Sequence, residues 1–158
     1  MGAFIVQYRF VGYFMGRSRI AVLAAASAGG HWTQLLRLRL AWEGCDVAYV
    51  TTDPSLAHAV ISGSRVYSVA EASRWEKAKL VKSASQVAGI LIRERPDVII
   101  TTGAAVGYFA ILFGRLLGCR TLWIDSIANA EEVSLSGQKA GRIADLFLTQ
   151  WPELEKDG

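Results

Sequence analysis

Apolar runs of strand length alternate with helix-like segments along most of the chain, and this alternation limits the fold more than any other feature. The first run, Ile20 to Ala26, is continuously apolar, which is typical of a strand buried on both faces. Later runs predict strands at 47–51, 65–69, 97–101, 120–124 and 145–149. Strands that alternate with helices form parallel sheets covered on both faces, and right-handed crossovers then give a doubly wound sheet. The sequence therefore predicts an α/β, Rossmann-like fold.

Helices are expected between these strands, at 31–42, 53–61, 76–95, 104–117 and 137–144. The clearest is 76–95, which Pro96 ends and whose apolar residues follow the 3–4 spacing of one buried face: Leu80, Ala84, Val87, Ala88, Leu91 and Ile92. The segment 104–117 is apolar on nearly all sides, whereas a helix on a sheet normally has a polar outer stripe. We expect it to be deeply buried, or else to face a partner or lipid.

Composition excludes several classes of protein. The chain has 158 residues, enough for one domain, and its 52% apolar content excludes intrinsic disorder. A net charge of +3 is too small for a dedicated nucleic-acid binder. The two cysteines, Cys45 and Cys119, form no CxxC pair or His/Cys cluster. We expect buried free thiols in a reducing compartment, no metal site and no organic cofactor.

Residues 1–19 form a basic, aromatic leader ahead of the predicted domain at 20–158. Their apolar stretch, Phe4 to Met15, is interrupted by Arg9 and is shorter than the ~20 apolar residues of a membrane span. Such a segment can lie on a membrane surface. The alternative interpretation is a frayed extension, or a start assigned upstream of Met15. Its basic residues follow the apolar stretch, which is not the order of a signal peptide.

Three loops follow strands at the carboxyl edge of the predicted sheet, where ligands bind in open α/β folds. In the first, Gly29 and Gly30 precede a helix whose free N–H groups and dipole favour a phosphate or diphosphate. His31 and Thr33 add side-chain donors there. A tight structural turn would also explain the two glycines, because neither a G-x-G-x-x-G nor a Walker A pattern is present.

The second and third loops add further polar and small residues at the same edge. Thr102-Gly103-Ala104 again joins a strand to a helix start, and Asp125 and Ser126 end the strand at 120–124. The Asp125 carboxylate is placed to take a sugar hydroxyl or a proton, or else it caps a turn. For His31 three roles are open: general base, acceptor ligand or structural cap.

Four segments resemble an oligosaccharide-biosynthesis family that includes asparagine-linked glycosylation protein fourteen and its bacterial exopolysaccharide counterparts. Ser27-Ala28-Gly29-Gly30-His31 with Leu35-Leu36 resembles the family's SxGGHxxxLL opening. The segments at 95–105, 125–128 and 145–154 resemble its P-D-x-x-x-x-T/S-G-A, E-S-x-A/C and ADxFxxQWPEL patterns.

This resemblance implies the amino-terminal lobe of a split GT-B glycosyltransferase. A second small protein would then carry the UDP-sugar site, with N-acetylglucosamine the expected sugar, and the pair would act only together at the cytosolic face of a membrane. The acceptor would be a polyprenyl or dolichyl diphosphate-linked sugar. By this resemblance Gly29, Gly30 and His31 would face the acceptor diphosphate, and the segment Gln150-Trp151-Pro152 would lie near the junction with the partner. The candidate catalytic residues are His31 and Asp125. The candidate acceptor-binding residues are Ser27, Gly29, Gly30, His31, Thr33, Thr102, Gly103, Ala104 and Ser126.

Two other functions compete with this one. A free-standing nucleotide-binding protein such as an oxidoreductase is expected to have a third glycine in the first loop and an acidic residue at the end of the second strand. Here the third glycine is absent, and only Asp53 lies near the end of that strand. A purely structural anchor would make no ligand contact at all.

Overall fold

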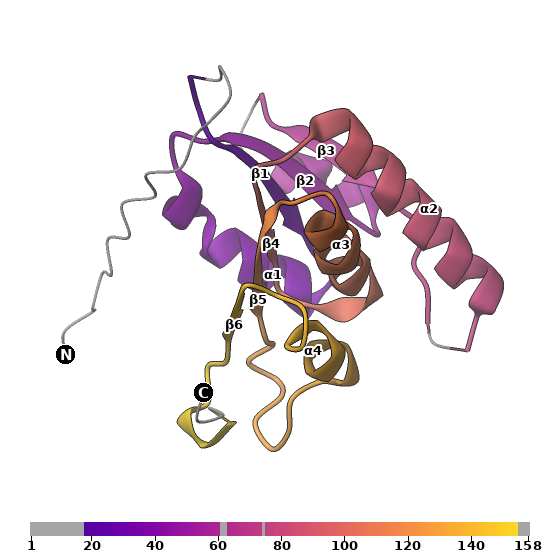
Figure 1. Cartoon of the computed structure of the whole chain (residues 1–158), viewed down its shortest axis with the longest axis vertical. Helices are drawn as coiled ribbons and strands as arrows, with labels where there is room; N and C mark the ends of the chain where they lie inside the picture. Colours follow the sequence, from indigo (N-terminus) through magenta and orange to yellow (C-terminus); the bar gives the residue numbers. More distant parts are fainter. Residues whose placement is uncertain (1–17, 61–62, 74, 155–158) are drawn as a thin grey trace.

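One parallel sheet organises the molecule. The computed structural model describes residues 18–60, 63–73 and 75–154. In this part of the chain six strands form a single sheet in the order β3-β2-β1-β4-β5-β6, with helices on both faces (Figure 1). This is the doubly wound Rossmann order, so the predicted fold class is confirmed. The leader proposed at 1–19 lies outside the described residues, apart from Ser18 and Arg19.

The strands fall close to their predicted positions because each is a short, buried apolar run. Their bounds are β1 Ala21–Ala25, β2 Asp46–Thr51, β3 Arg65–Ser68, β4 Val98–Thr101, β5 Arg120–Ile124 and β6 Leu146–Leu148. Successive side chains alternate between two cores, as the pleat requires. In β1, Leu23 and Ala25 join one core while Val22 and Ala24 join the other.

The helices divide between the two faces of the sheet. One face carries α2 (Lys77–Glu94), α3 (Ala104–Leu116) and α4 (Leu135–Ala140), and its core includes Val87, Leu91 and Ile111. The other carries α1 (Gly30–Arg37) and the 3₁₀ helices η1 (Arg39–Trp42) and η2 (Pro54–Ala59). There Trp32 and Tyr49 meet edge to face, with ring centroids 6.0 Å apart. A last 3₁₀ turn, η3 (Pro152–Leu154), follows β6.

Three of the predicted helices differ in detail from those observed. The helix expected at 31–42 changes to 3₁₀ geometry at Leu38, where Leu38 N–H bonds to the Leu35 carbonyl. The segment after Asp53 is also 3₁₀, with the Asp53 carboxylate accepting from Ser55 N–H. The helix α4 begins two residues earlier than expected, because Ser134 Oγ accepts from Gly137 N–H and caps it.

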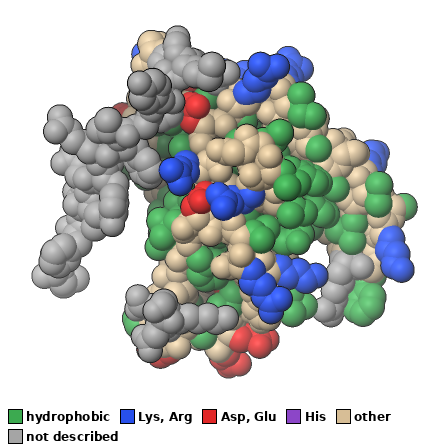
Figure 2. Space-filling model, viewed as in Figure 1, with side chains coloured by type: hydrophobic (Ala, Val, Ile, Leu, Met, Phe, Trp, Pro, Cys, Tyr) green, Lys and Arg blue, Asp and Glu red, His purple; other side chains and the backbone are tan. Residues whose placement is uncertain are grey.

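The apolar faces of α2 and α3 are only partly covered. Ser83, Val87 and Leu91 of α2 face the sheet, whereas Ile92 is 62% exposed, so its predicted place on the buried face is wrong. A residue next to Leu91 points about 100° away from it around the helix. In α3 the deep burial that we expected holds only for the sheet side, since Leu116 and Leu117 are exposed. Figure 2 shows hydrophobic side chains gathered over this side of the molecule.

The two cysteines are free thiols, as predicted, although only Cys119 is buried and Cys45 is half-buried. Burial raises the pKa of both thiols, and the Asp97 carboxylate raises that of Cys119 further. Both therefore stay protonated and unreactive at neutral pH. The reducing compartment stays a prediction.

Two glycines let α3 approach the sheet closely. A Cβ on Gly107 would lie 2.1 Å from Thr101 Oγ1, and one on Gly114 would lie 2.1 Å from Ile99 Cδ1. Both neighbours belong to β4, so α3 can lie this close to the strand only because glycine has no side chain at these two positions.

We predict that Gly107→Ala destabilises the fold by about 1–3 kcal/mol, because the added methyl overpacks a buried contact with a β-branched side chain. The matched control is Gly89→Ala on α2, where a Cβ meets nothing within 4 Å. There the higher helix propensity of alanine should add about 0.5–1 kcal/mol of stability. Urea unfolding of both variants measures the difference, and equal stabilities would contradict this packing.

Candidate functional site

The three candidate loops meet at the carboxyl edge of the sheet, which is the lower edge in Figure 1. β1 and β4 are neighbours, with Ala25 paired to Thr101, so the loops that follow them start side by side. The loop after β5 lies next to them because β5 pairs with β4. This is the point where the strand order reverses, which is where ligands bind in doubly wound sheets.

His31 and Thr102 join the first two loops through two hydrogen bonds. His31 Nδ1 lies 2.8 Å from the Thr102 carbonyl oxygen, and Thr102 Oγ1 donates to the His31 carbonyl at 2.7 Å. Thr102 is fully buried, while the His31 side chain is partly open to solvent. Sequence reasoning placed both residues at one edge, and the structure brings them into direct contact.

Glycine forms the N-cap of both helices that start here. Gly29 precedes α1 with φ +80°, and Gly103 precedes α3 with φ +131°. A glycine has no side chain to satisfy the first-turn N–H groups, so these donors remain for a ligand. A Cβ on Gly29 or Gly30 would meet nothing within 4 Å, which leaves open space above this helix start.

The other predicted binding residues surround this space unequally. Ser27 is half-buried, and Ser126 is mostly buried, with its Oγ accepting from Ala128 N–H. Thr33 Oγ1 is exposed and donates back to the Gly29 carbonyl at 3.2 Å. Ala104 adopts φ +65°, an unusual conformation for a residue with a Cβ, which marks a strained turn at the start of α3.

Asp125 is the centre of a buried polar network. The residue is only 2% exposed, and both of its carboxylate oxygens accept hydrogen bonds from other residues of the chain. Oδ1 accepts from Trp123 Nε1 at 3.0 Å and from Ser134 Oγ at 2.9 Å. Oδ2 accepts from Asn129 Nδ2 at 2.9 Å and from Ser134 N–H at 3.3 Å. These bonds fix the path of the loop between β5 and α4.

Backbone groups of the same loop hold α1 and the carboxyl-terminal segment. Gln34 Nε2 donates to the Asp125 carbonyl at 3.1 Å, and Gln34 Oε1 accepts from Ile127 N–H at 3.4 Å. Gln150 Nε2 approaches the Asp125 carbonyl at 3.4 Å, and Trp151 Nε1 donates to the Ile127 carbonyl at 3.0 Å. The loop therefore links the glycine helix start to the segment after β6.

Sequence reasoning missed the residues that support this arrangement, namely Gln34, Trp123, Asn129 and Ser134. Gln34 offered a signal, because it is a polar residue among the buried positions of α1. Ser134 offered another, because serine is a frequent N-cap residue and Ser134 lies three positions before the helix expected at 137–144. Trp123 lies in β5, two residues before Asp125, so its contact is local in the sequence. The contact of Asn129 with Asp125 depends on the path of the loop, which no local pattern encodes.

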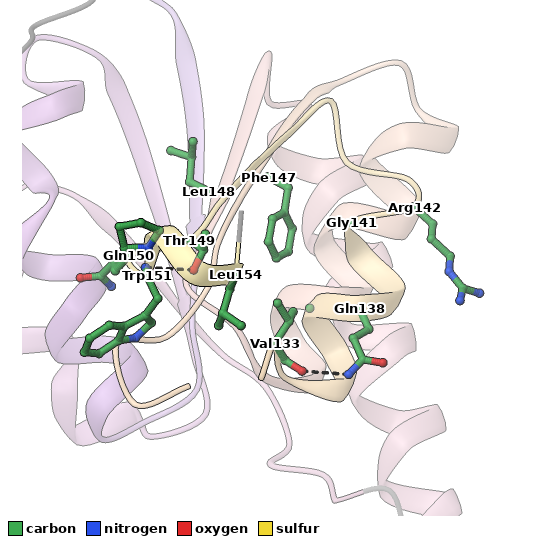
Figure 3. Close-up of a pocket in the computed structure, with 12 residues that line it drawn as sticks. Val133, Gln138, Gly141, Arg142, Phe147, Leu148, Thr149, Gln150, Trp151 and Leu154 are labelled. Atoms are coloured by element: carbon green, nitrogen blue, oxygen red, sulfur yellow. Dashed lines mark hydrogen bonds between the residues drawn. The ribbon is translucent and has the colours of Figure 1, made fainter. Parts of the chain in front are cut away.

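A cavity of about 520 Å³ lies between α4, β6 and η3. Figure 3 shows Phe147 from β6, Val133 from the loop before α4, and Leu154 from η3 around it. The predicted partner residues Gln150, Trp151 and Pro152 also line it. The cavity is thus at the sheet's outer edge, beside rather than above the paired glycine turns.

No helix within the described ranges has both the length and the apolar content needed to cross a bilayer.

Comparison with known proteins decides the family. A model of the family described as "Oligosaccharide biosynthesis protein Alg14 like" matches residues 46–157. The chain belongs to this family. The resemblance inferred from its motifs is confirmed, although the matched range begins after the glycine turn of α1.

Relatives of this Alg14-like chain include two proteins named UDP-N-acetylglucosamine transferase subunit ALG14. The mouse protein is 24% identical, over 89% of this chain and 79% of its own length. The Eremothecium gossypii protein is 30% identical, over 47% of this chain but only 38% of its own length.

Solved structures show the same fold at low sequence identity. Acinetobacter baumannii MurG matches with a TM-score of 0.72 and 18% identity, over 88% of this chain and 44% of that one. The UDP-GlcNAc 2-epimerase of Methanocaldococcus jannaschii matches with a TM-score of 0.63 and 13% identity, over 82% and 39%. The Alg14-like chain therefore corresponds to less than half of each of these proteins.

We predict that Asp125→Asn destabilises the Alg14-like fold by about 2 kcal/mol, because the new amide NH₂ would face donors that now bond to a carboxylate oxygen. For a chain of this size that lowers Tm by roughly 4–8 °C. Glu131→Gln, an exposed change in the same loop, is the control and should stay within about 0.5 kcal/mol. Thermal unfolding followed by circular dichroism measures both, and an unchanged Tm for Asp125→Asn would refute the network's role.

Proposed function

We propose that this chain is the acceptor-binding subunit of a two-component UDP-N-acetylglucosamine transferase acting on a polyprenyl or dolichyl diphosphate-linked sugar. The observation that carries the proposal is the convergence of two glycine-capped helix starts on His31, at the reversal point of the sheet. Membership of the Alg14-like family and the names of the relatives support it.

The acceptor diphosphate fits the space above Gly29 and Gly30. The first-turn N–H groups of α1 and α3 donate to phosphate oxygens, and both helix dipoles favour negative charge there. In this proposal Ser27, Gly29, Gly30 and Thr33 contact the diphosphate from one side, and His31 meets the hydroxyl of the acceptor. Thr102, Gly103, Ala104 and Ser126 complete the site. Of these, the buried Thr102 acts through His31, because both its hydroxyl and its carbonyl are bonded to that residue.

The two candidate catalytic residues separate in this structure. His31 is partly exposed at the site, so it is the residue that we propose to meet the acceptor. The Asp125 carboxylate is buried and already accepts four hydrogen bonds. We therefore propose that Asp125 organises the loop between β5 and α4, and that it does not touch the acceptor.

A second protein would supply the nucleotide-sugar site. Support comes from the word "subunit" in the relatives' names. The cavity beside Trp151 is the surface that we propose for this partner. Its lining combines Phe147, Leu154 and Trp151, the kinds of side chain that form the buried centre of interfaces.

The subunit would work at the cytosolic face of a membrane. The described surface supports this through α2, where Val81 is largely exposed between Lys77 and Lys82, and Trp75, 79% exposed, precedes the helix. Aromatic and apolar side chains among lysines favour contact with an anionic lipid surface. Figure 2 shows Lys and Arg side chains around the hydrophobic region of this face. The leader at 1–19 would add to this contact.

The oxidoreductase alternative has less support. Asp53, the acid that would bind a ribose, caps η2 by accepting from Ser55 N–H at 2.9 Å, and hydrogen bonding by Ser55 lowers the pKa of this carboxyl. Saturable NAD(P) binding in calorimetry would nevertheless restore that alternative.

We predict that the isolated chain transfers no N-acetylglucosamine, and that transfer to a polyprenyl diphosphate-linked sugar appears when it is mixed with its nucleotide-sugar-binding partner.

Gly30→Val should abolish this transfer, because the added side chain fills the diphosphate space, while the pair still forms. Radiolabelled UDP-N-acetylglucosamine measures transfer, with Gly89→Ala as the control that keeps activity. Turnover by the chain alone, or full activity of Gly30→Val, would reject the proposal.

We predict that Trp151→Ala weakens pairing with the same partner by roughly 30-fold or more, the equivalent of about 2 kcal/mol for a central aromatic residue. Trp75→Ala removes an exposed tryptophan elsewhere and should leave pairing unchanged. Surface plasmon resonance measures both affinities. Equal affinities for the two variants would place the interface away from the cavity.

A further inference from the structure

The contact between His31 and Thr102 determines which ring nitrogen carries the proton. The partner of His31 Nδ1 is a backbone carbonyl oxygen, 2.8 Å away. A carbonyl oxygen only accepts hydrogen bonds, so Nδ1 must be the donor. In the neutral ring the lone pair is then on Nε2. Free histidine favours the opposite tautomer, so the protein imposes this one.

Thr102 holds its carbonyl in place through a second bond. Its hydroxyl donates to the His31 carbonyl at 2.7 Å, so the two residues bond to each other in both directions. Thr102 is fully buried, which shields this pair of bonds from competing water. The residues are 71 positions apart in the chain, and the pair therefore fixes two separate loops relative to each other.

The imidazole ring of His31 packs against the backbone of Gly103. A Cβ at this position would lie 2.7 Å from His31 Cε1 and 2.8 Å from Nδ1, so the ring packs directly on the glycine backbone. Gly103 and Ala104 both have positive φ, +131° and +65°, where the chain turns into α3. This turn directs the Thr102 carbonyl toward the ring. Ala104, whose φ of +65° is unusual for a residue with a Cβ, must be held in that conformation by the surrounding contacts.

We propose that Thr102 is a positioning residue that keeps His31 in the Nδ1–H tautomer and presents Nε2 to the acceptor. Of the three roles open for His31, this tautomer fits a general base. Neutral Nε2 has a lone pair that accepts a proton, whereas it has no hydrogen to donate to a diphosphate. The Thr102 carbonyl then also stabilises the imidazolium that forms.

The step that this tautomer serves rests on the proposed function. The acceptor hydroxyl attacks C1 of N-acetylglucosamine, and a new C1–O bond forms while the bond from C1 to the UDP oxygen breaks. The electron pair of the broken bond leaves with UDP. The hydroxyl proton passes to His31 Nε2, which becomes protonated while Nδ1–H stays bonded to the Thr102 carbonyl.

Nitrogen NMR tests the tautomer directly on the full chain. The protein has two histidines, so a His58→Asn variant leaves His31 as the single imidazole in the spectrum. His58 is exposed on η2, so this change should not disturb the fold. Long-range ¹H–¹⁵N correlations of the ¹⁵N-histidine-labelled protein, recorded in alkaline buffer, should show a protonated Nδ1 and an unprotonated Nε2. A protonated Nε2 would overturn the proposal.

Two substitutions at Thr102 test the positioning role. Thr102→Val keeps the shape but removes the hydroxyl, and should produce a mixture of tautomers. Thr102→Ser keeps the hydroxyl and should restore the single one. If Thr102→Val does not fold, Gly103→Ala provides a second test. The added methyl group displaces the His31 ring from the glycine backbone and should give the same mixture of tautomers. If the Thr102→Val or the Gly103→Ala protein folds and its spectrum is unchanged, Thr102 does not position the His31 ring.

Kinetics of the reconstituted pair separate this proposal from the proposed function. Thr102→Val should lower kcat by roughly tenfold or more, part of the 10²–10⁴ that a general base contributes, with little change in the KM for the acceptor. Thr102→Ser should recover most of that loss. A loss confined to KM would contradict positioning for catalysis. A correct NMR spectrum in a pair that transfers no sugar would instead contradict the proposed function and leave the tautomer assignment standing.

Discussion

The pairing of β1 with β4 is the constraint on which the rest of the site depends. Two other strands, β2 and β3, separate them in the chain, yet they lie side by side at the centre of the sheet, with Leu23 opposite Ile99 and Ala25 opposite Thr101. Both are buried on their two faces, so neither can slip by one residue without exchanging its cores. Their carboxyl ends therefore deliver two glycine turns to one place.

Polar contacts then convert this proximity into a fixed geometry. The edge is held by a few hydrogen bonds between side chains and backbone groups of different loops, chiefly those of His31, Gln34 and Asp125. Each involves at least one residue that is buried in the structure. Breaking one leaves a polar group unsatisfied, which costs more than the bond contributes when formed. In our proposal, support and binding therefore belong to different residues: Asp125 organises the loop, and His31 meets the ligand.

Much of this architecture was predictable because it depends on local patterns. Buried parallel strands are continuous apolar runs, so β1, β4 and β5 were placed within about a residue, and Gly29, Gly103 and the QWPEL segment marked the edge and the family. The errors have local causes too. Ile92 follows helical spacing but points away from the sheet, since spacing defines a stripe and does not decide which side of it is covered.

The sequence by itself determined the order of elements, the glycine helix starts and the presence of His31 and Asp125 at the carboxyl edge, because each follows from residue type and position along the chain. Only the tertiary structure decided what those side chains do. The imidazole of His31 is held through one nitrogen by a residue 71 positions away. The carboxylate of Asp125 is buried and satisfied because the loop after β5 folds back over it. Such contacts arise from strand order and loop path, and a linear pattern holds no record of either.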